Sequence, residues 1–198
     1  RQIFSLLEKR IETLHITRSM QDRADSLSLE AIEVSDHINM VTRLSNLAIQ
    51  LYSWYIKNGH AINREEEIKI ETFFNDHLPA GSFNKKGFYE TLYLYQSLCW
   101  LSFIKQDFLK YYRYSQKWVD LFDSNPLMKR VETGHYIKGL HNLLNAHFDL
   151  RNYKPFVSTL QQLELFAKQD RVVDNENFRI QSFLNLTQAK INLNFLQG

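Results

Sequence analysis

The stretch that decides the fold is KGFYETLYLYQSLCWLSFIKQDFLKYYRYSQKWVDLF, residues 86–122. Its first half, residues 86–104, places apolar or aromatic side chains on every side of a helical wheel, which predicts a central, buried helix. The polar turn Lys105-Gln106-Asp107 interrupts this run, and a second periodic stretch follows from Phe108 to Phe122. We therefore predict two antiparallel helices joined by a short turn.

The rest of the chain follows the same plan on both sides of this hairpin. Only 6 glycines and 3 prolines interrupt the 198 residues, and they separate long periodic stretches. We expect residues 21–28 to form a turn, Asn58-Gly59 to end a helix, and Asp174 to cap the last one. The predicted helices are residues 3–17, 29–58, 64–77, 86–104, 108–122, 129–150, 153–168 and 175–196.

The hairpins repeat with a period of about 45 residues. The pair Asp107-Phe108 superposes on Asn152-Tyr153 when the sequence is shifted from 107 to 152. The same shift brings further apolar positions into register: Leu98 with Leu143, Phe103 with Phe148, Trp118 with Leu163, and Leu121 with Phe166. Because a single helical hairpin cannot cover its own apolar side, such a period indicates a stacked row of hairpins.

On these residues the chain resembles the tetratricopeptide-repeat family. The apolar positions of that family's first helix are matched by Tyr95/Leu98, Leu140/Leu143 and Ala48/Leu51, and the aromatic after the turn by Phe108 and Tyr153. The resemblance implies an all-α, right-handed superhelix of antiparallel helix pairs, with a concave ligand-binding face. The sequence departs from the family because its repeats exceed about 34 residues. Large residues also occupy the family's small positions: Leu144, Tyr111, Phe156, Trp118 and Leu163.

This reading makes residues 1–198 a single helical-repeat domain. It begins with helices within residues 1–58, continues with pairs at about 41–78, 86–123 and 129–168, and ends on an unpaired helix at 175–196. An ordinary helical bundle is the alternative. Because the chain starts without methionine and ends on this helix, we expect it to be part of a longer protein.

Composition narrows the classes of partner. The net charge is only +2, so little field is available to attract nucleic acid or anionic lipid. No apolar run approaches the ~20 residues of a membrane-spanning helix, so we expect a soluble protein. The one cysteine, Cys99, lies in an apolar run and indicates a core position and a reducing, cytoplasmic setting. Oligomeric state is left open.

The motifs of catalysis and of cofactor or metal binding give little support to an enzyme. Phosphate loops, paired CxxC motifs and His-x-x-x-His are missing from the sequence. Glu12 with His15 and Glu132 with His135 have the Glu-x-x-His spacing of di-iron helices, but further glutamates cannot be placed around them. We therefore predict no catalytic residue, metal or cofactor.

The stretch 108–122 also carries a lane of basic residues, Lys110, Arg113 and Lys117, among tyrosines. Such a lane could contact phosphates, so a nucleic-acid-associated regulator is the alternative function. A helix packed on one side must expose charge on the other, and Asp120 continues the lane, which favours a solvated face.

Lanes of amide side chains are the strongest functional signal. Asn and Gln recur at helical spacing in the last two repeats, and amides can both donate to and accept from a peptide backbone. We predict that these amides, together with Lys138 and with Arg43, Asn46 and Gln50 of the helix at 29–58, line a concave groove that binds a peptide or protein partner. The protein is then a scaffold, adaptor or sensor. A plain solvent-facing surface is the alternative. The set comprises Arg43, Asn46, Gln50, Lys138, Asn142, Asn145, Gln181, Asn185, Gln188 and Asn192.

Overall fold

The computed structural model describes residues 21–84 and 87–197, and within them every regular element is a helix. The predicted helix at residues 3–17 lies outside these residues. The elements are α2 (Gln21–Asn58), α3 (Arg64–His77), α4 (Phe88–Ile104), α5 (Phe108–Asp123), α6 (Met128–Val131), α7 (Thr133–Asp149), α8 (Tyr153–Ala167), α9 (Asp170–Val173) and α10 (Glu176–Gln197). The all-α prediction is confirmed for the part of the chain described.

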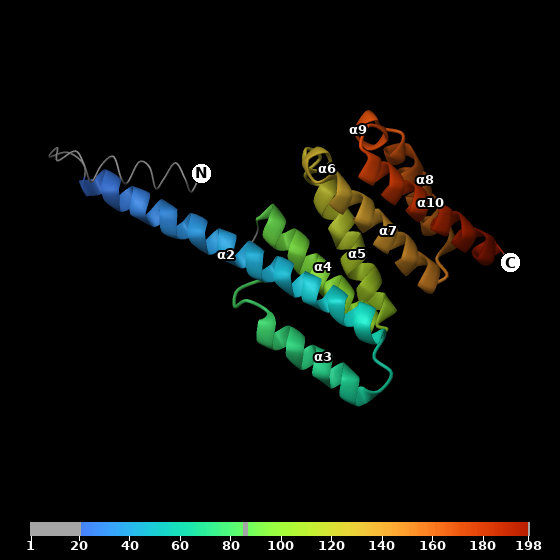
Figure 1. Cartoon of the computed structure of the whole chain (residues 1–198), viewed down its shortest axis with the longest axis horizontal. Helices are drawn as coiled ribbons and strands as arrows, with labels where there is room; N and C mark the ends of the chain where they lie inside the picture. Colours follow the sequence, from blue (N-terminus) through green and yellow to red (C-terminus); the bar gives the residue numbers. More distant parts are fainter. Residues whose placement is uncertain (1–20, 85–86, 198) are drawn as a thin grey trace.

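The helices follow one another in a row (Figure 1). Helices α3, α5 and α8 each run back along the helix before them, so that α2, α4, α7 and α10 point in the same direction. The main packing contacts join α2 to α4, α4 to α5, α5 to α7, α7 to α8, and both α7 and α8 to α10. Neighbours along the row therefore cover each other's apolar sides, and the helices do not gather around one centre.

The turns of two successive hairpins have the same backbone geometry, as the 45-residue shift predicts. Gln106 and Arg151 adopt left-handed φ angles of 58° and 57°. The next residues, Asp107 and Asn152, both have φ −83°, with ψ 76° and 75°. In each turn this residue donates its N–H to a carbonyl five residues back, at 2.9 and 2.8 Å, which closes the helix end.

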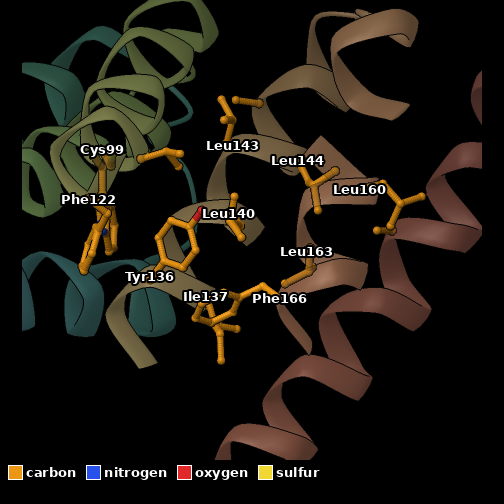
Figure 2. Packing of buried hydrophobic residues seen from close by; sticks show 14 of the residues in the cluster. Cys99, Phe122, Tyr136, Ile137, Leu140, Leu143, Leu144, Leu160, Leu163 and Phe166 are labelled. Atoms are coloured by element: carbon orange, nitrogen blue, oxygen red, sulfur yellow. The ribbon is translucent and has the colours of Figure 1, made fainter. Parts of the chain in front are cut away.

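The core consists of two apolar clusters that meet at α4. Leu94, Leu98 and Ile104 belong to the cluster shared with α2 and α3, whereas Leu92 and Cys99 belong to the cluster shared with α5, α7 and α8. Figure 2 shows the second cluster, in which the side chains of α7 lie between those of α5 and α8. The prediction that residues 86–104 form a central, buried helix is confirmed by α4, which contributes to both clusters.

Helices α5 and α7 approach closely at a glycine. A Cβ on Gly139 would lie 3.1 Å from Cδ1 and Nε1 of the Trp118 indole, which is fully buried. A larger side chain there would push the two helices apart. Gly139 on α7 thus makes room for the large Trp118 side chain on α5.

Three predicted boundaries were wrong. Residues 21–28 belong to α2, where Leu27 is buried and continues the apolar spacing without a glycine or proline to stop the helix. The predicted helix at 129–150 is broken at Glu132, with φ −115° and ψ 46°, into α6 and α7. The cap of α10 is Asn175, whose Oδ1 accepts the N–H of Phe178 at 3.1 Å, and not Asp174, which ends α9.

Helix α10 is covered on one side. Its stripe of Leu186, Ala189 and Leu193 packs on the second core cluster. Its other apolar stripe has exposed side chains, with exposed fractions of 50% for Ile180, 59% for Leu184, 52% for Ile191 and 70% for Phe195. Within the described residues, α10 is therefore packed along one of its two apolar stripes.

Candidate functional site

A pocket of about 360 Å³ lies between α2, α4, α7 and α10. We call it the Lys138 pocket. Side chains from α2, α4, α7 and α10 line it, together with one tyrosine from α5. Its lining residues are Tyr52, Tyr55, Cys99, Trp100, Phe103, Tyr111, Lys138, His141, Asn142, Asn145 and Gln188.

One wall of the pocket is aromatic. Tyr52 and Tyr55 face the same side of α2, and Trp100 and Phe103 have the same spacing on α4. The ring centroids of Tyr52 and Trp100 lie 5.0 Å apart, those of Tyr55 and Trp100 5.6 Å, and those of Tyr55 and Phe103 5.1 Å. These tilted ring contacts between two helices hold the rings together as a continuous surface.

Lys138 on α7 faces this wall. Its Nζ lies 5.6 Å from the ring centroid of Tyr52 and 5.9 Å from that of Trp100, within the range of cation–π attraction. Among the described residues, no Asp or Glu forms an ion pair with it. Burial lowers the pKa of its amine below the usual value. The pocket therefore contains a partly desolvated lysine that rests on aromatic rings.

Amide and imidazole groups form the other wall. Asn142 is buried, and its Oδ1 accepts the hydroxyl of Tyr111 at 3.2 Å. The Nδ2 of Asn145 lies 3.1 Å from Nε2 of His141, and Gln188 reaches the pocket from α10. Burial, followed by the nearby charge of Lys138, lowers the pKa of His141 to about 4. The imidazole is thus neutral at pH 7 and can accept from Asn145.

The structure brings four of the ten predicted site residues to this pocket: Lys138, Asn142, Asn145 and Gln188. The other three amides on α10 are half-buried and lie outside the lining: Gln181, Asn185 and Asn192. The three predicted residues on α2 are exposed: Arg43, Asn46 and Gln50.

The α2 residues miss the pocket because of the helical period. At 100° per residue, Arg43 points about 180° away from Tyr52, the residue by which α2 reaches the pocket. Asn46 and Gln50 lie on the same distant side as Arg43. The structure therefore does not join the α2 lane and the α7 lane in one surface.

Sequence reasoning missed the aromatic wall. Aromatic residues at helical spacing are usually core residues, and Trp54, Tyr55 and Trp100 do pack against the core cluster shared by α2 and α4. One signal was present in the sequence, since Tyr52/Tyr55 and Trp100/Phe103 show the same spacing close to the ends of two parallel helices. That signal gains meaning once α2 and α4 are known to lie side by side.

A second polar cluster lies between the first half of α4 and the start of α7. The Tyr89 hydroxyl donates to Oε1 of Glu132 at 2.9 Å, and Nε2 of Gln96 lies 2.9 Å from Nδ1 of His135. The other imidazole nitrogen lies 3.9 Å from Oε2 of Glu132. Burial lowers the pKa of His135, so the neutral ring can accept from Gln96. This Glu-x-x-His pair thus takes part in hydrogen bonds that join α4 to α7.

Among the residues that the structure describes, no three His, Cys, Asp or Glu side chains gather as possible metal ligands. Glu12 and His15 lie outside the described residues.

The basic lane on α5 is exposed and lies on the side of the helix away from buried Trp118. Lys110 pairs with Oδ2 of Asp107 at 3.0 Å, and Nζ of Lys117 lies 5.6 Å from the Tyr114 ring centroid. Two of its three cations thus have partners on their own helix or its cap.

None of the described helices combines the length and apolar character that crossing a bilayer demands.

Comparison of the chain with protein-family models, with curated proteins and with solved structures gives no match.

Proposed function

We propose that this protein is a helical-repeat scaffold that binds a peptide or protein segment, with the Lys138 pocket as part of the binding surface. In this proposal the row of hairpins forms a right-handed superhelix similar to tetratricopeptide repeats, and α2, α4, α7 and α10 face its concave side. One observation carries the proposal: four helices that are distant in sequence place aromatic, amide and ammonium groups around one pocket. Such a mixture of apolar surface and a few polar groups is typical of recognition sites.

The proposal includes no catalytic step. The amides of Asn145 and Gln188 can each donate to and accept from a peptide backbone, and the aromatic wall offers apolar contact. A reducing, cytoplasmic setting belongs to the proposal because the thiol of Cys99 is buried beside the Ser115 hydroxyl, 3.6 Å away.

Selection from a displayed library of random peptides tests this function. The pocket variant combines Lys138→Met, Asn145→Ala and Gln188→Ala, which spares the buried Asn142 and so leaves the fold intact. The control variant combines Lys110→Met, Arg113→Met and Lys117→Met, which are exposed on α5 and lie outside the pocket lining. We expect peptides selected on the native protein to lose at least about tenfold in affinity for the pocket variant and less than about twofold for the control.

The opposite pattern, or equal binding to all three proteins, would contradict the proposed surface. If the native protein selects no peptide above background, the peptide-binding function itself is wrong. Circular dichroism and urea unfolding of each variant separate loss of binding from loss of fold.

A further inference from the structure

We infer that the Lys138 pocket selects a carboxylate carried on an aromatic stem, with Lys138 binding the charge and the rings of Tyr52 and Trp100 receiving the stem. The inference rests on the proposed function and deepens it, because it gives the chemistry of the group that the pocket holds. The carboxylate can belong to a free aromatic acid or to an acidic residue beside an aromatic one in a peptide.

The charges around the pocket favour an anion. Its lining contains one ammonium group, on Lys138, and no carboxylate. Burial lowers the pKa of His135 and of His141, the imidazoles on either side of Lys138 along α7, which favours their neutral forms. The same helix carries Asp149, which acts on Tyr111 at another part of the lining but lies eleven positions from Lys138, about 16 Å along the helix axis. A partly desolvated cation without a counter-ion is stabilised by a ligand that brings a negative charge.

The hydrogen-bonding groups agree with this reading. Because Oδ1 of Asn142 accepts the Tyr111 hydroxyl, its Nδ2 is the group that remains to donate. The amide of Gln188 adds a second donor from the facing helix α10. Two amide donors and one ammonium can satisfy the two oxygens of a carboxylate, whereas a cationic ligand would find no charged acceptor in the lining.

The shape of the pocket indicates the stem. Tyr52, Tyr55 and Trp100 present a surface of linked rings directly beside the lysine. An aromatic ring stacks on such a surface, and an aliphatic chain fills it less completely. The volume of about 360 Å³ exceeds the ~150 Å³ cavity that holds benzene, so one ring and a short acidic arm fit. A whole helix would not fit.

Matched small probes test the inference. We would titrate phenylacetate, phenylacetamide and acetate into the ¹⁵N-labelled protein and follow the indole Nε1–H signal of Trp100, assigned with Trp100→Phe. Phenylacetate should bind at least about tenfold more tightly than either other probe, since one lacks the charge and the other lacks the ring. Lys138→Met should remove at least about tenfold of this affinity, and Lys110→Met less than about twofold.

Three results would overturn the inference. The first is a Trp100 signal that does not respond to phenylacetate up to about 20 mM. The second is an amide or acetate affinity within about twofold of the acid. The third is full phenylacetate binding by the Lys138→Met protein, with the fold of that variant verified by its ¹⁵N spectrum.

A second arm identifies the source of the carboxylate. The peptide acetyl-Ala-Phe-Glu-Ala-amide carries a ring beside a side-chain carboxylate and has no other charge. Binding at least about tenfold tighter than phenylacetate assigns the site to peptides, and equal or weaker binding assigns it to free acids. The proposed function and this inference can fail separately. If the selected peptides lose affinity for the pocket variant but phenylacetate binds no more tightly than phenylacetamide or acetate, the inference alone is wrong. Phenylacetate binding without any selected peptide refutes the peptide-binding function alone.

Discussion

The hairpins α4/α5 and α7/α8 have the same turn geometry but present different side chains to the pocket. Their turns have the same dihedral angles within a few degrees, and positions 45 residues apart, such as Trp118 and Leu163, are both fully buried. Trp100 and Asn145 are also 45 residues apart, and both line the pocket. One is an aromatic ring and the other an amide. The two hairpins thus share buried core positions and turn geometry, whereas the side chains that they present to the pocket differ.

The largest effect is expected in the equivalent core positions. Trp118→Ala and Leu163→Ala should each lower the free energy of unfolding, by about 3–5 and 2–5 kcal/mol, because each leaves a cavity in a fully buried site. Urea unfolding measures both. A loss below about 1 kcal/mol at either position would mean that the two hairpins do not share one buried register.

The second effect separates the hairpins by pH. Helix α7 carries His141 and His147, both with pKa values lowered to about 4 by burial, whereas the equivalent positions on α4 are Gln96 and Ser102. In the unfolded chain these histidines protonate near pH 6.5. Between pH 6.5 and about 4 the unfolded state therefore binds more protons, and the free energy of unfolding falls as the pH falls.

Replacing His147 by Gln should make this fall less steep, by up to about 1.4 kcal/mol per pH unit. Urea unfolding at several pH values gives the slope, which is independent of any constant loss of stability in the variant. The same slope in the native protein and in His147→Gln would contradict a neutral, buried imidazole. His77→Gln on α3, whose imidazole is exposed and bonds its own helix, is the matched control.

The smallest effect distinguishes two turns that have the same backbone. The side chain of Asp107 accepts the N–H of Lys110 at 3.1 Å and caps α5, whereas Asn152 makes no such hydrogen bond at the start of α8. Asp107→Ala should therefore cost about 1 kcal/mol, and Asn152→Ala a few tenths at most. Thermal unfolding compares the pair, and equal losses would show that the cap does not set them apart.

How far the sequence predicts this fold is clear from particular elements. The turns at 105–107 and 151–152 follow from polar residues placed after long apolar runs, and burial of α4 follows from the lack of a polar side on that helix. The start of α2 was not predictable, because the Ser and Asp residues within 22–28 favour a turn. Burial of Leu27 accompanies the helix there, and the sequence does not reveal this burial. The break at Glu132, between α6 and α7, was not predictable either, because that position holds neither glycine nor proline.

The pocket was less predictable than the fold. Lys138, Asn142 and Asn145 could be identified because polar residues recur on one side of an otherwise apolar helix. Tyr52 and Trp100 could not, because their functional meaning depends on the contact of α2 with α4 and on the approach of Lys138 from α7. Residues 52 and 138 are far apart in the sequence, and periodicity within single helices does not encode such a contact.

Chemical-shift mapping of a library-selected peptide bound to the ¹⁵N-labelled protein shows whether the Lys138 pocket is the binding surface. The proposed binding surface predicts that the largest shift changes fall on α2, α4, α7 and α10 at Tyr52, Trp100, Lys138 and Asn145. Changes centred on the α5 lane of Lys110, Arg113 and Lys117, with the pocket signals unmoved, would contradict it.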